Sequence, residues 1–246
     1  MRLLEGRVVV VTGGAGGLGG AICSAVTAHG GTPVVLDRAA PAHAPQGEAW
    51  TLICDLTDEA ATTAAFARIL DRHPRLDGLV CCAGGGTGAP EENTAAGLSP
   101  ATLQEVLDGN LFSALHTVNA ALPGLARATS PAIVTLGSLN GRAPTPDGGY
   151  SHYGVAKAAV HMYTRYLART LGPRGIRVNA LAPGPVLTER LRRVWAGRPV
   201  ERVVDGIALG RLPDPSEIAD PVVFLLSELA SYVSGQVLAV DGGLVH

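Results

Sequence analysis

The chain has 246 residues, of which 47% are hydrophobic and 16% charged, so it holds enough apolar material for one large core and is expected to form a single domain over residues 1–246. Its net charge of −2 lacks the basic excess typical of proteins that bind nucleic acid or a membrane surface. No apolar run approaches the ~18 residues that cross a bilayer, and the N-terminus has no signal-peptide pattern, so we expect a cytoplasmic protein.

Short β-branched runs alternate along the chain with longer helical segments. Strands are expected at Arg7–Thr12, Pro33–Asp37, Trp50–Cys54, Asp77–Cys82, Ala132–Gly137, Ile176–Leu181 and Gln236–Val240. Helices are expected at Leu18–His29, Asp58–His73, Pro100–Ala126, Tyr153–Leu171 and Pro215–Leu229. Unbroken apolar runs are typical of strands buried on both faces, so the alternation predicts an α/β fold, a doubly wound parallel sheet of about seven strands with helices on both faces.

A glycine-rich loop, Thr12–Gly19 (TGGAGGLG), joins the first strand to the first helix. Bare backbone lets a pyrophosphate approach closely, and the helix N-terminus behind it supplies N–H groups and a positive dipole end. A purely structural turn is the alternative, because tight turns need glycine anyway. The position between a buried strand and a helix favours a dinucleotide site, with Gly13, Gly17, Leu18 and Gly19 as its residues.

Two acids that end the second and third strands bear on the choice of dinucleotide. Asp37 is placed to accept hydrogen bonds from the ribose hydroxyls and to repel a 2′-phosphate, which favours NAD over NADP. Arg38 follows and could grip a 2′-phosphate, but Asp37 would have to move away and Gly16 offers no basic side chain. Asp55 is placed either to reach the adenine edge or to cap the next helix.

Ser138, Tyr153 and Lys157 form a candidate catalytic set. Ser138 follows an apolar strand, and Tyr153 and Lys157 are i and i+4 on one helix, so both face the same side. A phenol with a pKa of about 10 is a poor acid–base at neutral pH, and a nearby lysine ammonium favours its ionised form. Such a trio could hold a carbonyl oxygen and supply its proton after hydride transfer. For an isolated Y-x-x-x-K, a helix-start aromatic and a solvated charge would be the simpler interpretation.

Over essentially its whole length the chain resembles the short-chain dehydrogenase/reductase family. The matching features, in the family's order, are TGGAGGLG at 12–19, Asp37, Asp55, Ala83–Gly84, Asn110, Ser138, Tyr153–Lys157 (YGVAK), Pro183–Gly184 and VDGG at 240–243. The resemblance implies a Rossmann-type fold and hydride transfer between a nicotinamide cofactor and a carbonyl or secondary alcohol. It also implies a homotetramer, in which surface apolar residues of two long helices pair.

The resemblance implies a role for each matched residue. Tyr153 would be the general acid–base, Ser138 would orient the substrate, and Lys157 would assist Tyr153 and hold the nicotinamide ribose. Asn110 would anchor a water that links Lys157 to solvent. The nicotinamide carboxamide would be seated by Pro183, Gly184 and Thr188, and Ala83 and Gly84 would lie in the cofactor loop after the fourth strand.

Two departures from the family pattern stand out. Cys81–Cys82 replaces the usual Asn-Asn before Ala83–Gly84, and a thiol is a weak hydrogen-bonding group, so contacts made there by an amide are lost or replaced. The interval from Ser138 to Tyr153 is longer than expected, which indicates an enlarged loop at Pro144–Gly149. Tyr150 competes for the acid–base role but has no lysine four residues later, so Tyr153 is preferred.

Residues 188–210 are expected to form a lid over the substrate. An anionic substrate and a solvated helix face are the two interpretations of its basic residues, and the solvated face is favoured. Those residues are Arg190, Arg192, Arg193, Arg198 and Arg202, and Trp195 on the same stretch packs either a substrate or the core. His152 could touch substrate, whereas His29, His73 and His161 are interpreted as helix residues without partners. No metal site is expected, and Cys23, Cys54, Cys81 and Cys82 are interpreted as buried free thiols.

Three functions therefore remain open. The preferred one is an NAD-dependent alcohol dehydrogenase or ketoreductase acting on a small molecule. An NADPH-dependent reductase of the 3-oxoacyl-carrier-protein type is the nearest alternative among enzymes, with Gly16 and Asp37 against it. A dinucleotide-sensing protein that has lost catalysis is the alternative of another class, and the presence of Asn110, Ser138, Tyr153 and Lys157 argues against it.

Overall fold

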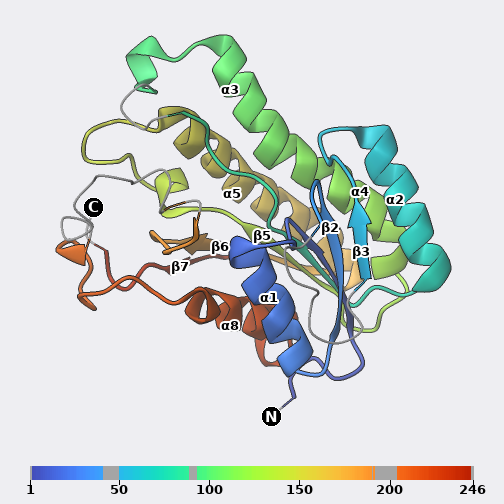
Figure 1. Cartoon of the computed structure of the whole chain (residues 1–246). Helices are drawn as coiled ribbons and strands as arrows, with labels where there is room; N and C mark the ends of the chain where they lie inside the picture. Colours follow the sequence, from blue (N-terminus) through green and yellow to red (C-terminus); the bar gives the residue numbers. More distant parts are fainter. Residues whose placement is uncertain (1, 41–49, 89–92, 190, 192–203, 245–246) are drawn as a thin grey trace.

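Seven parallel strands form one sheet in the order β3-β2-β1-β4-β5-β6-β7 (Figure 1). They are β1 Val8–Thr12, β2 Thr32–Asp37, β3 Trp50–Ile53, β4 Gly78–Cys81, β5 Ala132–Leu136, β6 Arg177–Pro183 and β7 Val237–Val240. The computed structural model describes residues 2–40, 50–88, 93–189, 191 and 204–244. The strand order reverses between β1 and β4, where doubly wound sheets place their ligand crevice. The predicted fold class is confirmed.

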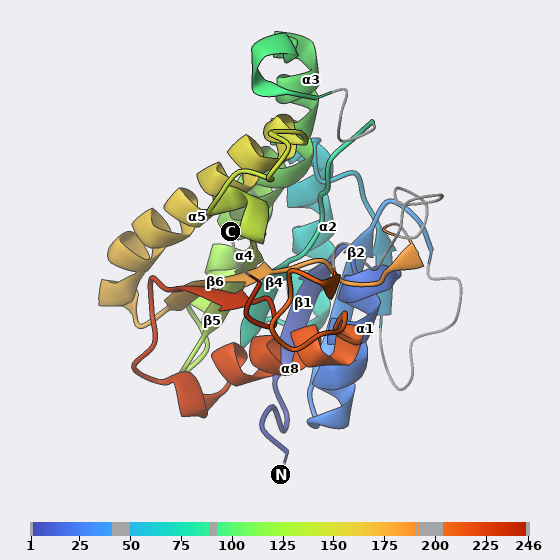
Figure 2. The ribbon, with the colours of Figure 1, turned by 90° about the vertical axis from the view of Figure 1, so that its left-hand side faces the viewer.

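Helices cover both faces of the sheet, as Figure 2 shows from the side. One face carries α1 Gly17–Ala28 and α8 Pro215–Leu226; the other carries α2 Glu59–Arg72, α4 Ser113–Leu125 and α5 Ser151–Leu171. The helix α3, Pro100–Leu107, extends beyond the sheet. Short 3₁₀ turns lie at Ala95–Gly97, Leu139–Gly141, Gly172–Arg174 and Glu228–Ala230.

The alternation of side chains along each strand divides the core into two layers. In β1, Val9 and Val11 pack with residues of α1 and α8, whereas Val10 packs with residues of α2, α4 and α5. All three valines are fully buried. Because both faces of a parallel sheet are covered, every position of such a strand must be apolar, which explains the unbroken valine run.

The helix expected at Pro100–Ala126 is interrupted, so that prediction was wrong in one respect. A π-helical turn, Asp108–Phe112, separates α3 from α4. The side-chain amide of Asn110 donates a hydrogen bond to the Val106 carbonyl, 2.7 Å away and four residues earlier, where a regular α-helix would bring the backbone N–H. Wide turns of this kind are frequent at functional sites, and Asn110 lies within this one.

Acidic side chains cap the starts of two helices. Asp58 caps α2 and accepts a hydrogen bond from the Ala61 N–H at 3.0 Å, and Asp214 forms a capping box with Glu217 at the start of α8. The helix α8 ends at Leu226, three residues earlier than predicted. In the described part of the chain, no helix is long and apolar enough to cross a membrane.

Candidate active site

The residues singled out in the sequence follow the carboxyl ends of successive strands, and in a parallel sheet these ends share one edge. The glycine loop follows β1, Asp37 ends β2, and Ser138 follows β5. Pro183 is the last residue of β6 rather than the first after it, and it pairs with Val240 of β7. This common edge is where ligands bind in doubly wound folds.

The glycine loop is tightly packed on one side and bare on the other. A Cβ at Gly19 would lie 2.1 Å from the Gly13 carbonyl oxygen, and a Cβ at Gly13 would lie 3.0 Å from the backbone of Ala83. Gly16 and Gly17 have no neighbour within 4 Å of such a Cβ, and Gly16 caps α1 without any side-chain hydrogen bond. The loop therefore presents bare backbone and an uncapped helix N-terminus, which fits the pyrophosphate of a dinucleotide.

Thr12 holds the segment that follows β4. Its Oγ1 accepts hydrogen bonds from the N–H groups of Cys82 and Ala83, at 3.0 and 3.1 Å. These hydrogen bonds anchor the start of the loop after β4, where Cys81–Cys82 replaces the usual Asn-Asn. Burial raises the pKa of the Cys81 thiol to about 12 and that of Cys82 to about 11, so both thiols stay protonated.

Asp37 joins the end of β2 to the glycine loop. Its Oδ2 accepts a hydrogen bond from the Ala15 N–H at 3.0 Å, and its Oδ1 accepts one from the Ala39 N–H at 3.2 Å. A carboxylate therefore lies directly against the candidate dinucleotide loop. A 2′-phosphate brought to the same place would meet this negative charge.

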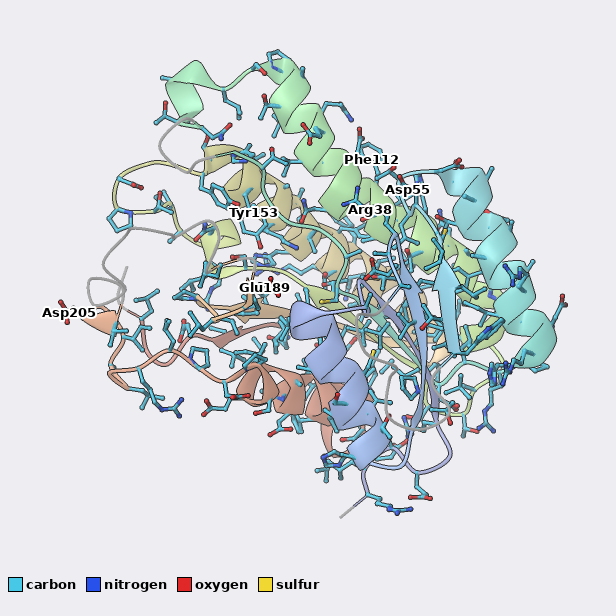
Figure 3. All side chains as sticks on the ribbon, in the orientation of Figure 1. Arg38, Asp55, Phe112, Tyr153, Glu189 and Asp205 are labelled. Carbon is cyan, nitrogen blue, oxygen red and sulfur yellow. The ribbon has the colours of Figure 1, made fainter. Side chains whose placement is uncertain are left out.

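Arg38 and Asp55 lie side by side at the ends of β2 and β3 (Figure 3). Asp55 Oδ1 accepts hydrogen bonds from the backbone N–H and the hydroxyl of Thr57, which lower the pKa of Asp55. Asp55 does not cap the next helix, because Asp58 does. That interpretation of Asp55 was wrong, and contact with the adenine edge remains a prediction.

Asn110 fastens the loop after Ala83 to the π-helical turn. Its Oδ1 accepts a hydrogen bond from the Gly85 N–H at 3.0 Å, and its Nδ2 donates one to the Gly85 carbonyl at 2.9 Å. Gly84 has φ of +133°, and a Cβ there would lie 2.4 Å from Asn110 Oδ1. The glycine of the Ala83–Gly84 pair is thus required both for its backbone conformation and for this close contact.

Tyr153 and Lys157 lie on the first turns of α5, which begins at Ser151, two residues earlier than predicted. The Lys157 ammonium lies 5.5 Å from the centroid of the Tyr153 ring. Lys157 is only 4% exposed, and its Nζ donates a hydrogen bond to the Leu136 carbonyl at 2.6 Å. A buried positive charge beside a phenol stabilises the phenolate relative to the neutral form.

Ser138 lies two residues beyond Leu136, at the start of the 3₁₀ turn Leu139–Gly141. Its Oγ accepts a hydrogen bond from the Asn140 N–H at 3.2 Å. This turn packs on α5, since a Cβ at Gly154 would lie 2.9 Å from the Asn140 carbonyl oxygen. The structure therefore brings the Ser138 turn against the same end of α5 that carries Tyr153.

Tyr150 contributes a second phenol to this end of α5. Its ring centroid is 5.2 Å from that of Tyr153, and its φ of 57° lies in the left-handed region. Its ring fills the space beside Gly86, where a Cβ would lie 2.6 Å from the phenol oxygen. The left-handed conformation of a bulky residue stores strain of the kind found at functional sites.

Three histidines expected to be without partners do have them. The Leu3 N–H donates to His29 Nδ1 at 3.4 Å, and His73 lies against the Trp50 ring with a centroid separation of 6.3 Å. His161 accepts a hydrogen bond from the Ser138 N–H through Nε2 at 3.3 Å. His152 is fully buried in the first turn of α5, where its Nε2 pairs with the Thr87 backbone. Sequence reasoning missed His161 because its partner lies on another element.

The region after β6 is described only in part. The Gly184 N–H donates a hydrogen bond to the Val240 carbonyl at 3.0 Å, and Thr188 Oγ1 accepts one from the Leu191 N–H at 3.2 Å. Most of the expected lid lies outside the described residues, including all five of its arginines and Trp195. Within the described part of the chain, no three His, Cys, Asp or Glu side chains gather as a metal site requires.

Known proteins resemble this chain over its full length. A family model described as enoyl-(acyl carrier protein) reductase matches residues 13–245. The cyclohexanol dehydrogenase of Rhodococcus sp. (strain TK6) is 36% identical, with 99% of this chain and 97% of that protein covered. The galactitol 2-dehydrogenase (L-tagatose-forming) of Cereibacter sphaeroides is 38% identical, with 98% and 95% covered. The ligand-free aldohexose dehydrogenase of Thermoplasma acidophilum superposes with a TM-score of 0.89 at 27% identity, with 99% and 95% covered.

Proposed function

Because this chain belongs to the short-chain dehydrogenase/reductase family, we propose that it moves a hydride between NAD(H) and a secondary alcohol or its ketone. The observation that carries this proposal is the Tyr153–Lys157 pair at one end of α5, with the Ser138 turn packed against it. All three residues lie at the sheet edge where the glycine loop opens.

The residues divide the chemistry among them. Bound nicotinamide supplies or accepts the hydride. Ser138 holds the substrate oxygen with its hydroxyl, and Tyr153 takes the proton from that oxygen in oxidation or returns it in reduction. Lys157 favours the phenolate of Tyr153 by its charge and holds the nicotinamide ribose. Asn110, at the π-helical turn, anchors the water through which Lys157 exchanges protons with solvent.

The cofactor is held along the edge of the sheet. Gly13, Gly17, Leu18 and Gly19 receive the pyrophosphate, and Ala83 and Gly84 line the path of the ribose. Asp55 reaches the adenine edge, and Pro183, Gly184 and Thr188 seat the carboxamide. Asp37 selects NAD, because its carboxylate lies against the loop at Ala15 and repels a 2′-phosphate.

The relatives support the substrate class. Two relatives are named for the oxidation of cyclohexanol and of galactitol at its 2-position, and both of these groups are secondary alcohols. We infer that this chain also acts on a secondary alcohol. From the expectation drawn from the sequence, we also propose that this chain is cytoplasmic.

A titration of the purified chain with NADH and NADPH, each followed by nicotinamide fluorescence, tests the cofactor. We expect NADH to bind at least about tenfold more tightly, a difference of about 1.4 kcal/mol. Asp37→Ser should reduce the difference in affinity between NADH and NADPH, because it removes the carboxylate that repels the 2′-phosphate. Tighter binding of NADPH by the unaltered chain would contradict the role of Asp37. That result would favour the alternative function, an NADPH-dependent reductase of the 3-oxoacyl-carrier-protein type, with Arg38 as the residue that binds the 2′-phosphate.

A spectrophotometric assay tests the reaction. The chain is mixed with NAD and a panel of secondary alcohols that includes cyclohexanol, and NADH formation is followed. Turnover of at least one member is expected. Tight binding of NADH without turnover of any alcohol, or of any ketone in the reverse direction, would instead support a dinucleotide-sensing protein.

A further inference from the structure

The backbone that presents Ser138 is held at three successive residues. The Leu136 carbonyl accepts a hydrogen bond from Lys157 Nζ, and the Gly137 N–H donates one to the Leu181 carbonyl of β6 at 2.7 Å. The Ser138 N–H donates to His161 Nε2 at 3.3 Å. Lys157 and His161 are i and i+4 on α5, so one face of this helix holds both ends of the three-residue segment.

His161 is built into this place. Its side chain is buried, with 4% exposed, and burial lowers its pKa to about 4. The imidazole is therefore neutral at physiological pH, and Nε2 has a free lone pair for the Ser138 N–H. A further hydrogen bond to the Gly141 backbone raises the pKa, as donation to a carbonyl does. The ring thus joins the two ends of the 3₁₀ turn that begins after Ser138.

Gly137 is matched to His161. A Cβ at Gly137 would lie 2.0 Å from His161 Nε2, and a Cβ at Gly141 would lie 2.9 Å from its Cε1. Because the first distance is far below any real carbon–nitrogen contact, any other residue at 137 would displace the ring. The imidazole fills the space that the missing side chain leaves.

From this arrangement we propose that His161 is a positioning residue for Ser138, and that Gly137 is the residue that makes room for it. His161 touches neither substrate nor cofactor in this assignment. It holds the Ser138 backbone so that the hydroxyl meets the substrate oxygen, which rests on the proposed function of Ser138. Displacements of about 1 Å at such a group are known to cost up to about 100-fold in rate.

The first experiment compares His161→Leu with His161→Gln. Leu has no acceptor, whereas the Gln Oε1 reaches about as far as Nε2 and can accept from the Ser138 N–H. With a secondary alcohol that the unaltered chain oxidises, we expect His161→Leu to lower kcat/KM about 10- to 100-fold and His161→Gln to restore it to within a few-fold. The NADH dissociation constant should stay the same in both variants.

His29→Leu is the matched control. His29 also accepts a backbone N–H through an imidazole nitrogen, from Leu3, but it lies at the far end of α1 from the glycine loop. Its loss should leave kcat/KM unchanged. A loss of kcat/KM equal to that of His161→Leu would show a general effect of removing a histidine.

The second experiment asks whether His161 acts through Ser138. In a Ser138→Ala background, His161→Leu should lower the residual kcat/KM by less than about twofold, because the hydroxyl it positions is already gone. A further loss as large as in the unaltered chain would overturn the proposal and show a structural role only. Wild-type kinetics for His161→Leu would overturn it as well.

A third measurement does not depend on turnover. Unfolding by urea is followed for Gly137→Ala, His161→Ala and the double variant. Gly137→Ala alone should be strongly destabilising, and the double variant should lose far less stability than the sum of the two single changes. The clash with the ring is then gone, and only the milder contact of the new Cβ with the Leu181 carbonyl oxygen, at 3.1 Å, remains. Additive losses would contradict the pairing of Gly137 and His161. If the pairing holds while no alcohol is oxidised, the proposed reaction fails and the packing assignment stands.

Discussion

Two phenols lie within 5.2 Å of each other at the start of α5, and only one has a lysine beside it. We expect Tyr153→Phe to lower kcat about 10²- to 10⁴-fold, the usual contribution of a general acid–base, while NADH binding stays nearly intact. Tyr150→Phe is the matched control, because it removes a hydroxyl from a neighbouring ring that has Gly154 where a lysine would be needed. Steady-state kinetics and nicotinamide fluorescence of both variants provide the test. If Tyr150→Phe abolishes turnover and Tyr153→Phe does not, the two roles are exchanged.

Burial of His161 makes the stability of the chain depend on pH. Its pKa is lowered from an ordinary 6.5 to about 4 in the folded chain. Between these values the unfolded chain binds a proton at this residue and the folded chain does not, so stability falls as the pH falls. The full loss in the free energy of unfolding is about 3 kcal/mol, at 1.36 kcal/mol per pKa unit, and this loss is complete near pH 4. Urea unfolding at several pH values should show this loss in the unaltered chain.

In His161→Gln the group that titrates is gone, so the same acidification should destabilise the variant less. The difference between the two curves isolates His161 from the other groups that titrate in this range. Parallel curves would mean that His161 is protonated alike in the folded and unfolded chains.

At the scale of single residues, the sequence predicted interactions between residues that are near one another in the chain. Tyr153 and Lys157 could be paired because i and i+4 of a helix share a face, whatever the rest of the fold does. His161 could not be paired with Ser138, 23 residues earlier, without knowing how closely α5 packs on the end of β5. Asp55 shows the same limit, since the choice between capping and ligand binding depended on which acid starts α2.

The contact between the glycine loop and α1 depends on one missing side chain. A Cβ at Gly19 would lie 2.1 Å from the Gly13 carbonyl oxygen, and that atom belongs to backbone that cannot swing aside. Gly19→Ala should therefore displace the loop and weaken NADH binding by tenfold or more, about 1.4 kcal/mol. It should also lower the free energy of unfolding, as overpacking of about 1–3 kcal/mol does.

Gly20→Ala is the control within the same helix turn. A Cβ there meets only the Gly14 carbonyl oxygen, at 3.9 Å, which is an ordinary contact. Alanine in a helix interior is favoured over glycine by up to about 1 kcal/mol, so this variant should be as stable as the unaltered chain or more stable. Equal NADH affinities for the two alanine variants, measured by fluorescence titration, would contradict the close packing of Gly19.

The elements themselves were largely predictable because their patterns are local. The valine run of β1 and the capping acids of α2 and α8 each indicate an element without help from the fold. The π-helical turn was not predictable, because it depends on Asn110 bonding to both Val106 and Gly85, a residue from the loop after β4. A helical pattern in the sequence does not distinguish a regular turn from a widened one.

One face of α5 leaves apolar side chains uncovered. Val155 and Met162 are 49% exposed and Tyr166 is 68% exposed, and their spacing of seven and then four residues puts them on one stripe. We expect this stripe to pair with a second copy of the chain within a homotetramer. Light scattering coupled to size exclusion should give a mass near four times 25.1 kDa.

Charge placed on the stripe should weaken the assembly. Tyr166→Glu should shift the mass towards smaller species, whereas Arg68→Glu, at an exposed position of α2, should not. A monomeric mass for the unaltered chain would contradict the tetramer. Equal effects of the two variants would point to a general change in charge.

The order of the elements along the chain limited the topology of the whole molecule but did not determine the order of the strands. Strand–helix alternation with right-handed crossovers allows few arrangements, and the first strand must lie near the centre if both halves wind outward from it. The sheet order with β1 between β2 and β4 is one of those arrangements. The faces through which subunits would meet cannot be predicted in the same way. An apolar stripe on a helix is known to be exposed only once the packing of that helix is known.

The left-handed conformation of Tyr150 has a consequence for engineering. A bulky residue in that region costs about 1 kcal/mol relative to glycine, so Tyr150→Gly would relieve backbone strain in the folded chain. The same change would remove the ring that lies between Gly86 and Tyr153. A library selected for thermal tolerance would therefore set the relieved strain against the lost ring contacts and the greater entropy of glycine in the unfolded chain. A library selected for turnover would select on the ring itself, so a comparison of the residues that the two libraries keep at position 150 separates the cost of the strain from its use.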